Sequence, residues 1–273
     1  MSRRILLLAF AVWVSILVPV PSGAAAVGSV TFEAIDYGFK GPDTLPAGVV
    51  TIKIVNNGKE LHHVQLLRLA DGKTAADFGA ALKADGHPPT WISFRGGPNA
   101  AEGGATVEST VALEPGNYVL ICLIPDPKGT PHVALGMIKA LTVTPAANTA
   151  MTLPQSDITI APADFKFNVS RPLTPGPHTF HVENQGTQPH EVVLVALAPG
   201  KTIKAFAAAM APGASGPPPG HFIGGVVGLD PRGSANFSAT LKPGNYGLMC
   251  FFPDPATGKE HFMLGMLQDI SVK

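Results

Sequence analysis

Two stretches decide the fold of this chain: LICLIPDPKGTPHVALGM at residues 120–137 and LMCFFPDPATGKEHFMLGM at residues 248–266. Each stretch carries a cysteine, then a histidine, then a Gly-Met pair, in the same order. The spacings are C-x9-H-x4-M in the first and C-x10-H-x4-M in the second. Such a repeated set of reactive side chains predicts two copies of one domain.

The similarity extends far upstream of these stretches. Sliding the chain by 128 residues aligns residues 48–122 with residues 176–250 without a gap, and the sequence Pro-Gly-Asn-Tyr recurs at 115–118 and 243–246. Solenoid repeats are only about 20–50 residues long, so this period indicates a duplicated domain. We predict a first domain over residues 27–146, a linker over 147–156 and a second domain over 157–273. Because the linker is short, we expect the domains to touch.

The composition favours strands over long helices. Only 14% of the 273 residues are charged, and 30 Gly and 27 Pro divide the chain into short segments. The strands predicted in the first copy are Val49–Val55, Val64–Leu69, Thr106–Leu113, Tyr118–Cys122 and Ile138–Val143. Each copy also has one predicted short helix, at Thr74–Lys83 and Thr202–Met210, and we expect loops at Gly86–Gly104 and Ala211–Gly220. We therefore predict an all-β protein built from two tandem Greek-key β-sandwich domains.

Each copy offers four candidate metal ligands. They are His62, Cys122, His132 and Met137 in the first copy, and His190, Cys250, His261 and Met266 in the second. Two imidazoles, a thiolate and a weak thioether suit copper in both oxidation states, whereas zinc seldom takes methionine. The alternatives are a disulfide between the two cysteines and methionines that only fill the core. The matched His and Met partners of each cysteine favour metal ligation.

These residues resemble the cupredoxin family, and the resemblance covers residues 30–145 and 157–273. An Asn-x-Gly turn precedes the first histidine in both copies, at residues 56–58 and 184–186. The remaining ligands lie on the loop between the last two strands, as in that family. The resemblance implies two type 1 copper centres and a redox partner protein. It also implies that the loop histidines lie near the surface, among apolar residues such as Pro125, Pro131, Phe251 and Phe252.

Two features depart from the family pattern. The Cys-to-His loops are longer than in small plastocyanin-like proteins and closer to the type 1 domain of copper nitrite reductases. The residue after the first ligand histidine is often Asn in the family, but here it is His63 in one copy and Glu191 in the other. The hydrogen bonds around the ligands are therefore expected to differ from the family pattern, and the two centres to differ in reduction potential.

The neighbours of the cysteines favour an electron carrier over an enzyme. Multicopper oxidases and copper nitrite reductases place a histidine beside this cysteine, whereas here Cys122 and Cys250 are followed by Leu123 and Phe251. Copper sequestration or delivery is a second hypothesis. A nitrite-reductase-type oxidoreductase with a further copper between subunits is a third. The five other histidines are expected to be structural or exposed: His63, His87, His178, His181 and His221.

The first 26 residues predict export. They give a basic start, an apolar run and the small residues Ala24–Ala26, which is the pattern of a cleaved signal peptide, with a retained anchor as the alternative. Without this segment 17 basic and 19 acidic side chains remain. This balance gives no sign of nucleic-acid binding. We expect a periplasmic or secreted protein with no membrane span after cleavage.

Overall fold

The computed structural model describes residues 28–147, 149–211, 213–214 and 216–273. The predicted signal segment lies outside these residues. The N-terminal half contains β1 (Gly28–Ile35), β2 (Gly38–Lys40), β3 (Thr44–Pro46), β4 (Gly48–Asn56), β5 (Gln65–Leu69), α1 (Ala75–Asp85), β6 (Ile92–Phe94), β7 (Thr106–Leu113), β8 (Gly116–Ile121), the 3-10 helix η1 (His132–Leu135) and β9 (Ile138–Thr144). The C-terminal half contains β10 (Ile158–Ala163), β11 (Lys166–Val169), β12 (Gly176–Glu183), β13 (His190–Leu197), α2 (Ile203–Met210), β14 (Gly220–Leu229), β15 (Ser234–Leu241), β16 (Gly244–Met249), the 3-10 helix η2 (His261–Leu264) and β17 (Leu267–Val272).

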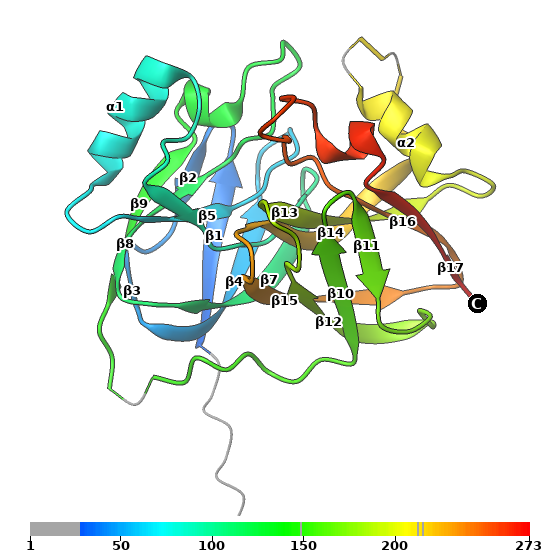
Figure 1. Cartoon of the computed structure of the whole chain (residues 1–273), viewed down its shortest axis with the longest axis horizontal. Coiled ribbons are helices and arrows are strands. Elements are labelled where there is room, and N and C mark those ends of the chain that lie inside the picture. Colours follow the sequence, from blue (N-terminus) through cyan, green and yellow to red (C-terminus); the bar gives the residue numbers. More distant parts are fainter. Residues whose placement is uncertain (1–27, 148, 212, 215) are drawn as a thin grey trace, which may run out of the picture.

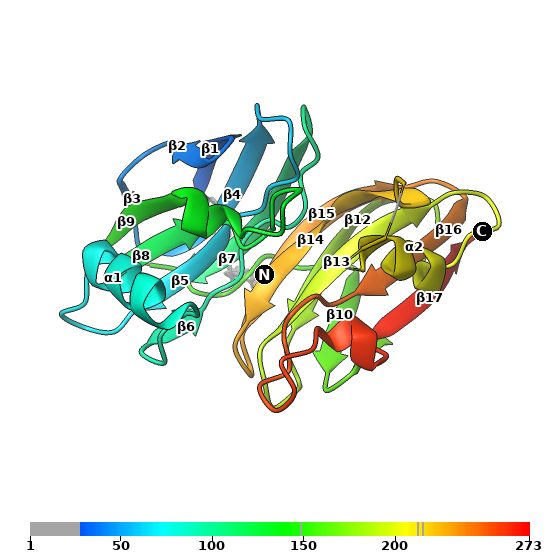
Figure 2. The ribbon, with the colours of Figure 1, turned by 90° about the horizontal axis from the view of Figure 1, so that it is seen from above.

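Each half is a sandwich of two sheets, as the repeat predicts. In the N-terminal half the order β3-β9-β8-β5-β6 faces β7-β4-β1-β2. In the C-terminal half β14-β13-β16-β17 faces β11-β10-β12-β15. Figures 1 and 2 show the two sandwiches side by side, with the helices of both halves at the same end in Figure 1. The all-β class and the two short helices are confirmed, while the exact domain boundaries stay a prediction.

Local sequence explains the main elements. Residues of β4 are alternately buried and half-buried, the period of a strand with one face on the core. The Pro-Gly-Asn-Tyr segments form the same corner twice, since Tyr118 donates a hydrogen bond to the Glu114 carbonyl and Tyr246 to the Lys242 carbonyl. Such tyrosine corners are typical of Greek-key sandwiches. The helix α1 begins at the N-cap Thr74, whose hydroxyl accepts from the Asp77 amide.

One segment expected to be a loop contains strand structure. The strand β6 lies inside the predicted loop 86–104, and Pro98 and Ala101 form further isolated bridges there. The segment is too short and too rich in glycine and proline to show strand periodicity. The strand β6 pairs with β5 of the same half, while Arg95 and Pro98 form bridges with Leu229 and Val226 of the other half, which the repeat within one domain could not reveal.

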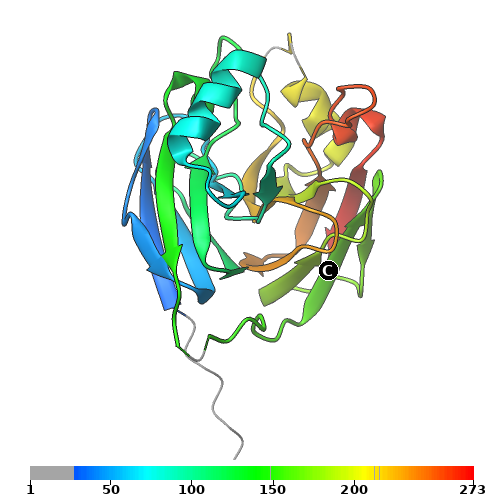
Figure 3. The ribbon, with the colours of Figure 1, turned by 60° about the vertical axis from the view of Figure 1, so that its left-hand side comes forward.

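The two halves join through a pseudo-two-fold interface. Strands β7 and β15 are equivalent in the repeat, and they pair with each other, so one eight-stranded sheet runs through both sandwiches (Figure 3). The amide of Val227 donates to the Gly97 carbonyl, and the amide of Asn99 donates to the Gly225 carbonyl. Asn99 is equivalent to Val227 and Gly97 to Gly225, so each bond is the counterpart of the other with the two halves swapped. Such a pair of reciprocal contacts defines an isologous interface. The predicted contact between the domains is therefore confirmed.

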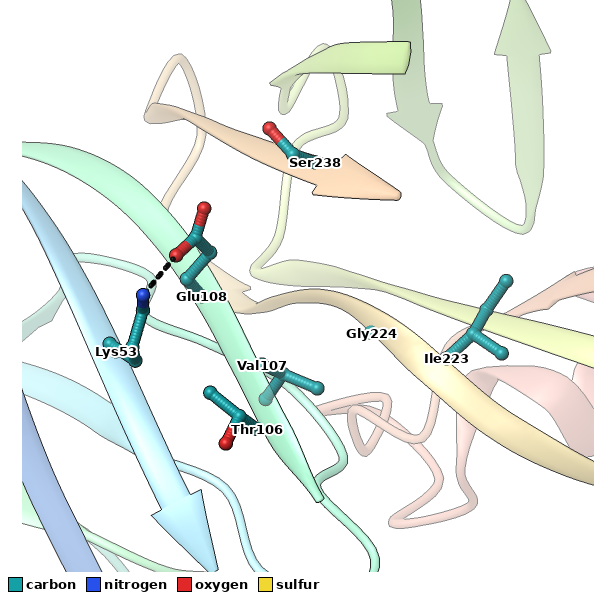
Figure 4. A pocket seen from close by; sticks show the side chains of 7 residues that line it. All are labelled: Lys53, Thr106, Val107, Glu108, Ile223, Gly224 and Ser238. Atoms are coloured by element: carbon teal, nitrogen blue, oxygen red, sulfur yellow. Dashed lines mark ion pairs between the residues drawn. The ribbon is translucent and has the colours of Figure 1, made fainter. Parts of the chain in front are cut away.

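A shallow pocket of about 200 Å³ lies beside this joint, between β7 of one half and β14 and β15 of the other (Figure 4). Lys53 and Glu108 form an ion pair of 3.2 Å on its wall. None of its lining residues is a predicted ligand. In the described part of the chain, we find no helix with the length and apolar character needed to cross a bilayer.

Candidate metal centres

The N-terminal centre gathers three predicted ligands from three places in the fold. His62 lies just before β5, Cys122 directly follows β8, and His132 opens η1. The two Nδ1 atoms of the histidines are 3.1 Å apart. Cys122 Sγ lies 3.5 Å from His132 Nδ1 and 4.0 Å from His62 Nδ1. All three residues are fully buried.

The C-terminal centre repeats this arrangement with His190, Cys250 and His261. The Nδ1 atoms of the two histidines are 3.0 Å apart, and Cys250 Sγ lies 3.4 Å from His261 Nδ1. The donor atoms of each centre lie within 4.8 Å of one another, and no other potential metal-binding group of three or more His, Cys, Asp or Glu is found in the described ranges. The structure thus brings together the residues that the sequence predicts.

The fourth predicted ligands are placed by a tight turn. Gly136 and Gly265 end η1 and η2 with φ values of 105° and 100°, in the left-handed region that favours glycine. The chain then turns back, so that the Met137 amide donates to the His132 carbonyl and the Met266 amide to the His261 carbonyl, both at 2.9 Å. Both methionines are fully buried. This turn explains why a Gly-Met pair follows each loop histidine at a fixed distance.

The donor set fits a type 1 copper centre. Metal–nitrogen and metal–sulfur bonds of about 2.0–2.3 Å place the donor atoms of a trigonal plane about 3–4 Å apart. The distances in both centres lie in this range. Two imidazoles and a thiolate with a weakly bound methionine are the blue-copper arrangement. His62, Cys122, His132 and Met137 would hold one ion, and His190, Cys250, His261 and Met266 would hold the other.

The protonation of the ligands follows from their burial. Burial lowers the pKa of His62 and of His190, and burial together with the nearby His190 lowers the pKa of His261 to about 4. Neutral imidazole is the form that binds metal. Burial also raises the pKa of Cys122 to about 12 and raises the pKa of Cys250. Without metal both thiols are therefore protonated at neutral pH, and metal binding must release their protons.

The far nitrogens of the ligand histidines have fixed partners. His62 Nε2 lies 2.9 Å from Asp36 Oδ1, and the equivalent His190 Nε2 lies 3.0 Å from Asp164 Oδ1. Glycine makes room for each pair, since a Cβ at Gly58 would lie 2.2 Å from Asp36 Oδ1. The hydrogen bond with His62 lowers the pKa of Asp36. Such carboxylate–histidine pairs set the tautomer and the orientation of a ligand ring.

Neighbouring side chains cover the loop histidines completely, so neither ring is itself exposed. His132 Nε2 lies 2.8 Å from Glu60 Oε2, and the Tyr37 ring covers the imidazole with ring centroids 4.9 Å apart. At the second centre His261 Nε2 lies 3.1 Å from Gln188 Oε1, and Phe165 packs edge-on at 5.3 Å. The turn between the first two strands of each half is thus a cover over the loop histidine, which the loop sequence alone could not indicate.

His63 and Glu191 anchor the two cysteine loops. His63 Nε2 accepts a hydrogen bond from the Leu123 amide at 2.9 Å, and Glu191 Oε1 accepts one from the Phe251 amide at 2.8 Å. Each donor is the residue after a ligand cysteine. Burial lowers the pKa of His63 to about 3 and raises the pKa of Glu191 to about 7. Two different side chains therefore hold the same loop position at the two centres.

Sequence reasoning missed the partners on the far side of the ligands. They are Asp36, Tyr37 and Glu60 at the first centre and Asp164, Phe165 and Gln188 at the second. The offset of 128 residues matches these two sets one to one. Extending the repeat upstream of Gly48 would have shown the repeated aspartate. Glu60 and its equivalent Gln188 differ in residue type, so the repeat would not have drawn attention to them.

Comparisons with known proteins give several similar structures. No protein-family model and no curated protein matches the chain. Auracyanin A, a "blue" copper protein from the green thermophilic photosynthetic bacterium Chloroflexus aurantiacus, is 30% identical, over 43% of this chain and 100% of its own, with a TM-score of 0.29. An auracyanin from Roseiflexus castenholzii is 22% identical, over 45% of this chain and 100% of its own, with a TM-score of 0.28. The copper nitrite reductase from Nitrosomonas europaea is 15% identical, over 91% of this chain and 94% of its own, with a TM-score of 0.28.

The residues themselves decide the family. Both centres have a first histidine after an Asn-x-Gly turn, and both have cysteine, histidine and methionine on the loop between the last two strands. In each half the histidine and cysteine donors converge in a buried site, and the methionine that follows them is also fully buried. The chain therefore belongs to the cupredoxin family of type 1 copper proteins, in a tandem form with two ligand sets.

Proposed function

We propose that this protein is an exported one-electron carrier with two type 1 copper centres. The observation that carries the proposal is the pair of buried trigonal donor sets, each held by fixed hydrogen bonds. Copper bound in such a set alternates between its cuprous and cupric states. The protein residues contribute a geometry that need not change when an electron arrives or leaves.

Three features of the chain suit this role. Complete burial of the ligands keeps water from the metal position. The Asp36 and Asp164 carboxylates orient one ligand ring at each centre, so those rings are held before metal binds. The amides after both cysteines are tied to His63 and Glu191, which keeps the cysteine loops in place.

The partner that we propose is another redox protein. The exposed apolar side chains Leu135 on η1 and Met263 on η2 lie on the short helices that begin with the loop histidines. They give a docking protein an apolar surface next to each centre. Because 17 basic and 19 acidic side chains nearly balance after signal cleavage, we expect the rate of electron transfer to a partner to vary little with ionic strength. On the basis of the predicted signal segment, we propose that this exchange takes place in the periplasm or outside the cell.

The absence of a histidine beside either cysteine in the sequence supports a carrier rather than an enzyme. Leu123 and Phe251 follow the cysteines and use their amides to anchor the loops. A covalent route from the thiolate to a catalytic copper would need a metal-binding side chain at these positions. We therefore propose that the chain itself has no catalytic copper.

The test is metal analysis with visible and electron paramagnetic resonance spectra of the wild type, Cys122→Ser and Cys250→Ser. The expected result is two coppers, an intense thiolate-to-copper band, rapid reversible reduction, and loss of one centre in each variant. Colourless protein that releases copper readily would instead support sequestration or delivery. A third copper per chain would support an oxidoreductase. A full signal in both variants would contradict the assignment of two centres.

A further inference from the structure

A chain of buried polar side chains crosses the interface between the two halves. Its members are His63, Asn99 and Glu191, which are 7%, 3% and 6% exposed. His63 directly follows one ligand histidine and Glu191 directly follows another, while Asn99 comes from the segment between β6 and β7. Burying three polar side chains is costly unless they are paired, so their contacts are a specific feature of this joint.

In the N-terminal half, this row of polar side chains begins at the loop that carries Cys122. The His63 backbone amide hydrogen-bonds to Cys122, and the His63 ring accepts a hydrogen bond at Nε2 from the amide of Leu123. Because Nε2 accepts this bond it carries no proton, so the proton of the imidazole lies on the other nitrogen, Nδ1. The side chain of Asn99 is the next polar neighbour of the ring.

Toward the C-terminal half, the side-chain amide of Asn99 makes the next contact. Asn99 Nδ2 donates to Glu191 Oε2 at 3.0 Å. The other oxygen of Glu191 accepts from the Phe251 amide, and the Glu191 backbone amide lies 3.4 Å from Cys250 Sγ. Covalent bonds, hydrogen bonds and the contact between His63 and Asn99 thus lead from one ligand sulfur to the other.

This bridge explains the different residues after the first ligand histidine. Positions 63 and 191 are equivalent, but the position equivalent to Asn99 is Val227, so only one side-chain amide is available to both His63 and Glu191. An amide offers one acceptor and one donor, which match an imidazole N–H on one side and a carboxylate on the other. Two histidines or two glutamates could not both be satisfied in this way.

We propose that His63, Asn99 and Glu191 form the route by which an electron passes between the two copper centres. The inference rests on the proposed electron-carrier function. In this step one copper is oxidised from the cuprous to the cupric state and the other is reduced from cupric to cuprous. No proton moves and no bond forms or breaks. Coupling is stronger through bonded and hydrogen-bonded atoms than through gaps between packed side chains, and the route starts and ends at the thiolates.

The experiment measures electron exchange within one chain. Both copper centres are loaded in a Met137→Gln background, because an altered axial ligand changes the potential and the spectrum of the first centre and so labels it. A pulse of radical reductant delivers less than one electron per chain, and absorption at the two bands follows the redistribution. A fast phase whose rate does not depend on protein concentration is expected. Asn99→Leu should lose this phase while keeping both copper bands.

Gln65→Leu is the matched control. Gln65 is 1% exposed and its amide also crosses the interface, donating to the Gly228 carbonyl at 3.0 Å, but it is not part of the bridge. This variant should keep the fast phase. The proposal is overturned if Asn99→Leu keeps the phase, or if Gln65→Leu loses it to the same degree.

Further measurements distinguish a failure of the bridge from a folding defect and from a failure of the proposed electron-carrier function. If Asn99→Leu loses a copper band, Asn99→Ala, which has a smaller side chain, is measured against the same two criteria. If the chain with both centres intact shows no thiolate-to-copper band, the electron-carrier function is wrong. If both bands are present but the fast phase is missing, the bridge alone is wrong.

Discussion

At the scale of single residues, the carboxylates behind the first ligand histidines make the most testable contribution. Asp36 hydrogen-bonds to His62, and its oxygens also accept from the Lys59 amide, so one side chain holds the ring and the turn before it. Loss of an outer partner of a metal-binding histidine typically costs about 10–100-fold in metal affinity. Asp36→Ala in a Cys250→Ser chain, which keeps only the first centre, should therefore bind copper about 10–100-fold more weakly.

Competition with a chelator of known affinity measures this loss. Asp71→Ala is the control. Asp71 is exposed and pairs with Arg68 at 3.6 Å, not with a ligand histidine. Equal affinities for Asp36→Ala and Asp71→Ala would show that the hydrogen bond does not orient the ligand ring. The same comparison with Asp164→Ala in a Cys122→Ser chain tests the second centre.

A second residue-scale prediction concerns pH. Hydrogen bonding to Asp157 raises the pKa of His178, and the pKa of Asp157 is lowered by bonds from His178 and Thr179 that outweigh its burial. The histidine's contribution to stability is present below its usual pKa of about 6.5 and is lost as pH rises through its raised value. The aspartate's contribution is lost only as pH falls below about 4. Arg171 also pairs with Asp157, at 3.0 Å.

His178→Gln should therefore destabilise the protein more near about pH 5.5 than near about pH 8.5, in urea unfolding of the metal-free protein. Because Asp157 is partly exposed, the difference should be about 1 kcal/mol or less. His87→Gln, at an exposed position after α1, is the control. The idea fails if the destabilisation by His178→Gln is the same at both pH values.

Some residues of the two metal centres could be predicted from the sequence and others could not. All eight ligands could be predicted from sequence, because their types, order and spacing recur in two copies. The repeat marks Asp36 as a recurring residue, but the roles of Asp36 and Glu60 could not be predicted, since both arise only when the chain folds around the ligand histidines. Asn99 was beyond reach for another reason: its partners lie on both sides of the interface, and its own counterpart is a valine.

At the scale of elements, two glycines let neighbouring strands approach. A Cβ at Gly97 would lie 2.0 Å from the Val64 carbonyl oxygen, and one at Gly225 would lie 1.9 Å from the Val192 carbonyl oxygen. Their φ values of 132° and 140° are also unfavourable for other residues. The repeat placed both glycines in equivalent positions, but only the fold shows that they lie against backbone at the joint between the halves.

Gly225→Ala should therefore lower the free energy of unfolding by at least about 1–3 kcal/mol, the cost of a strained backbone position, and by more if the contact forces β13 and β14 apart. Gly79→Ala in α1 is the control, because nothing lies within 4 Å of its added Cβ. Alanine in a helix should raise stability by about 0.5–1 kcal/mol. Urea unfolding of both variants measures the difference, and a Gly225→Ala protein as stable as the wild type would refute the close approach.

At the scale of the whole molecule, the pseudo-two-fold joint makes the two sandwiches one folding unit. The contacts come in exchanged pairs: Glu102 accepts from the Phe222 amide, and the equivalent Asp230 accepts from the Phe94 amide. The duplication predicted two similar domains that touch. It could not predict the continuous sheet, because nothing in one copy shows which of its edges meets the other copy.

We expect the metal-free protein to unfold in a single cooperative transition. Trp91 is the only tryptophan outside the predicted signal segment, so its fluorescence reports the N-terminal half, while circular dichroism reports both halves. Coincident transitions from the two probes are expected, as for a two-state protein.

A variant at the joint tests this coupling. Val226 is fully buried where it pairs with its equivalent, Pro98. Val226→Asp therefore buries a charge at the joint and should separate the two transitions. Val182→Ala, in the core of the C-terminal half, should shift both transitions together, and separate transitions in the wild type would show that the joint does not couple the halves.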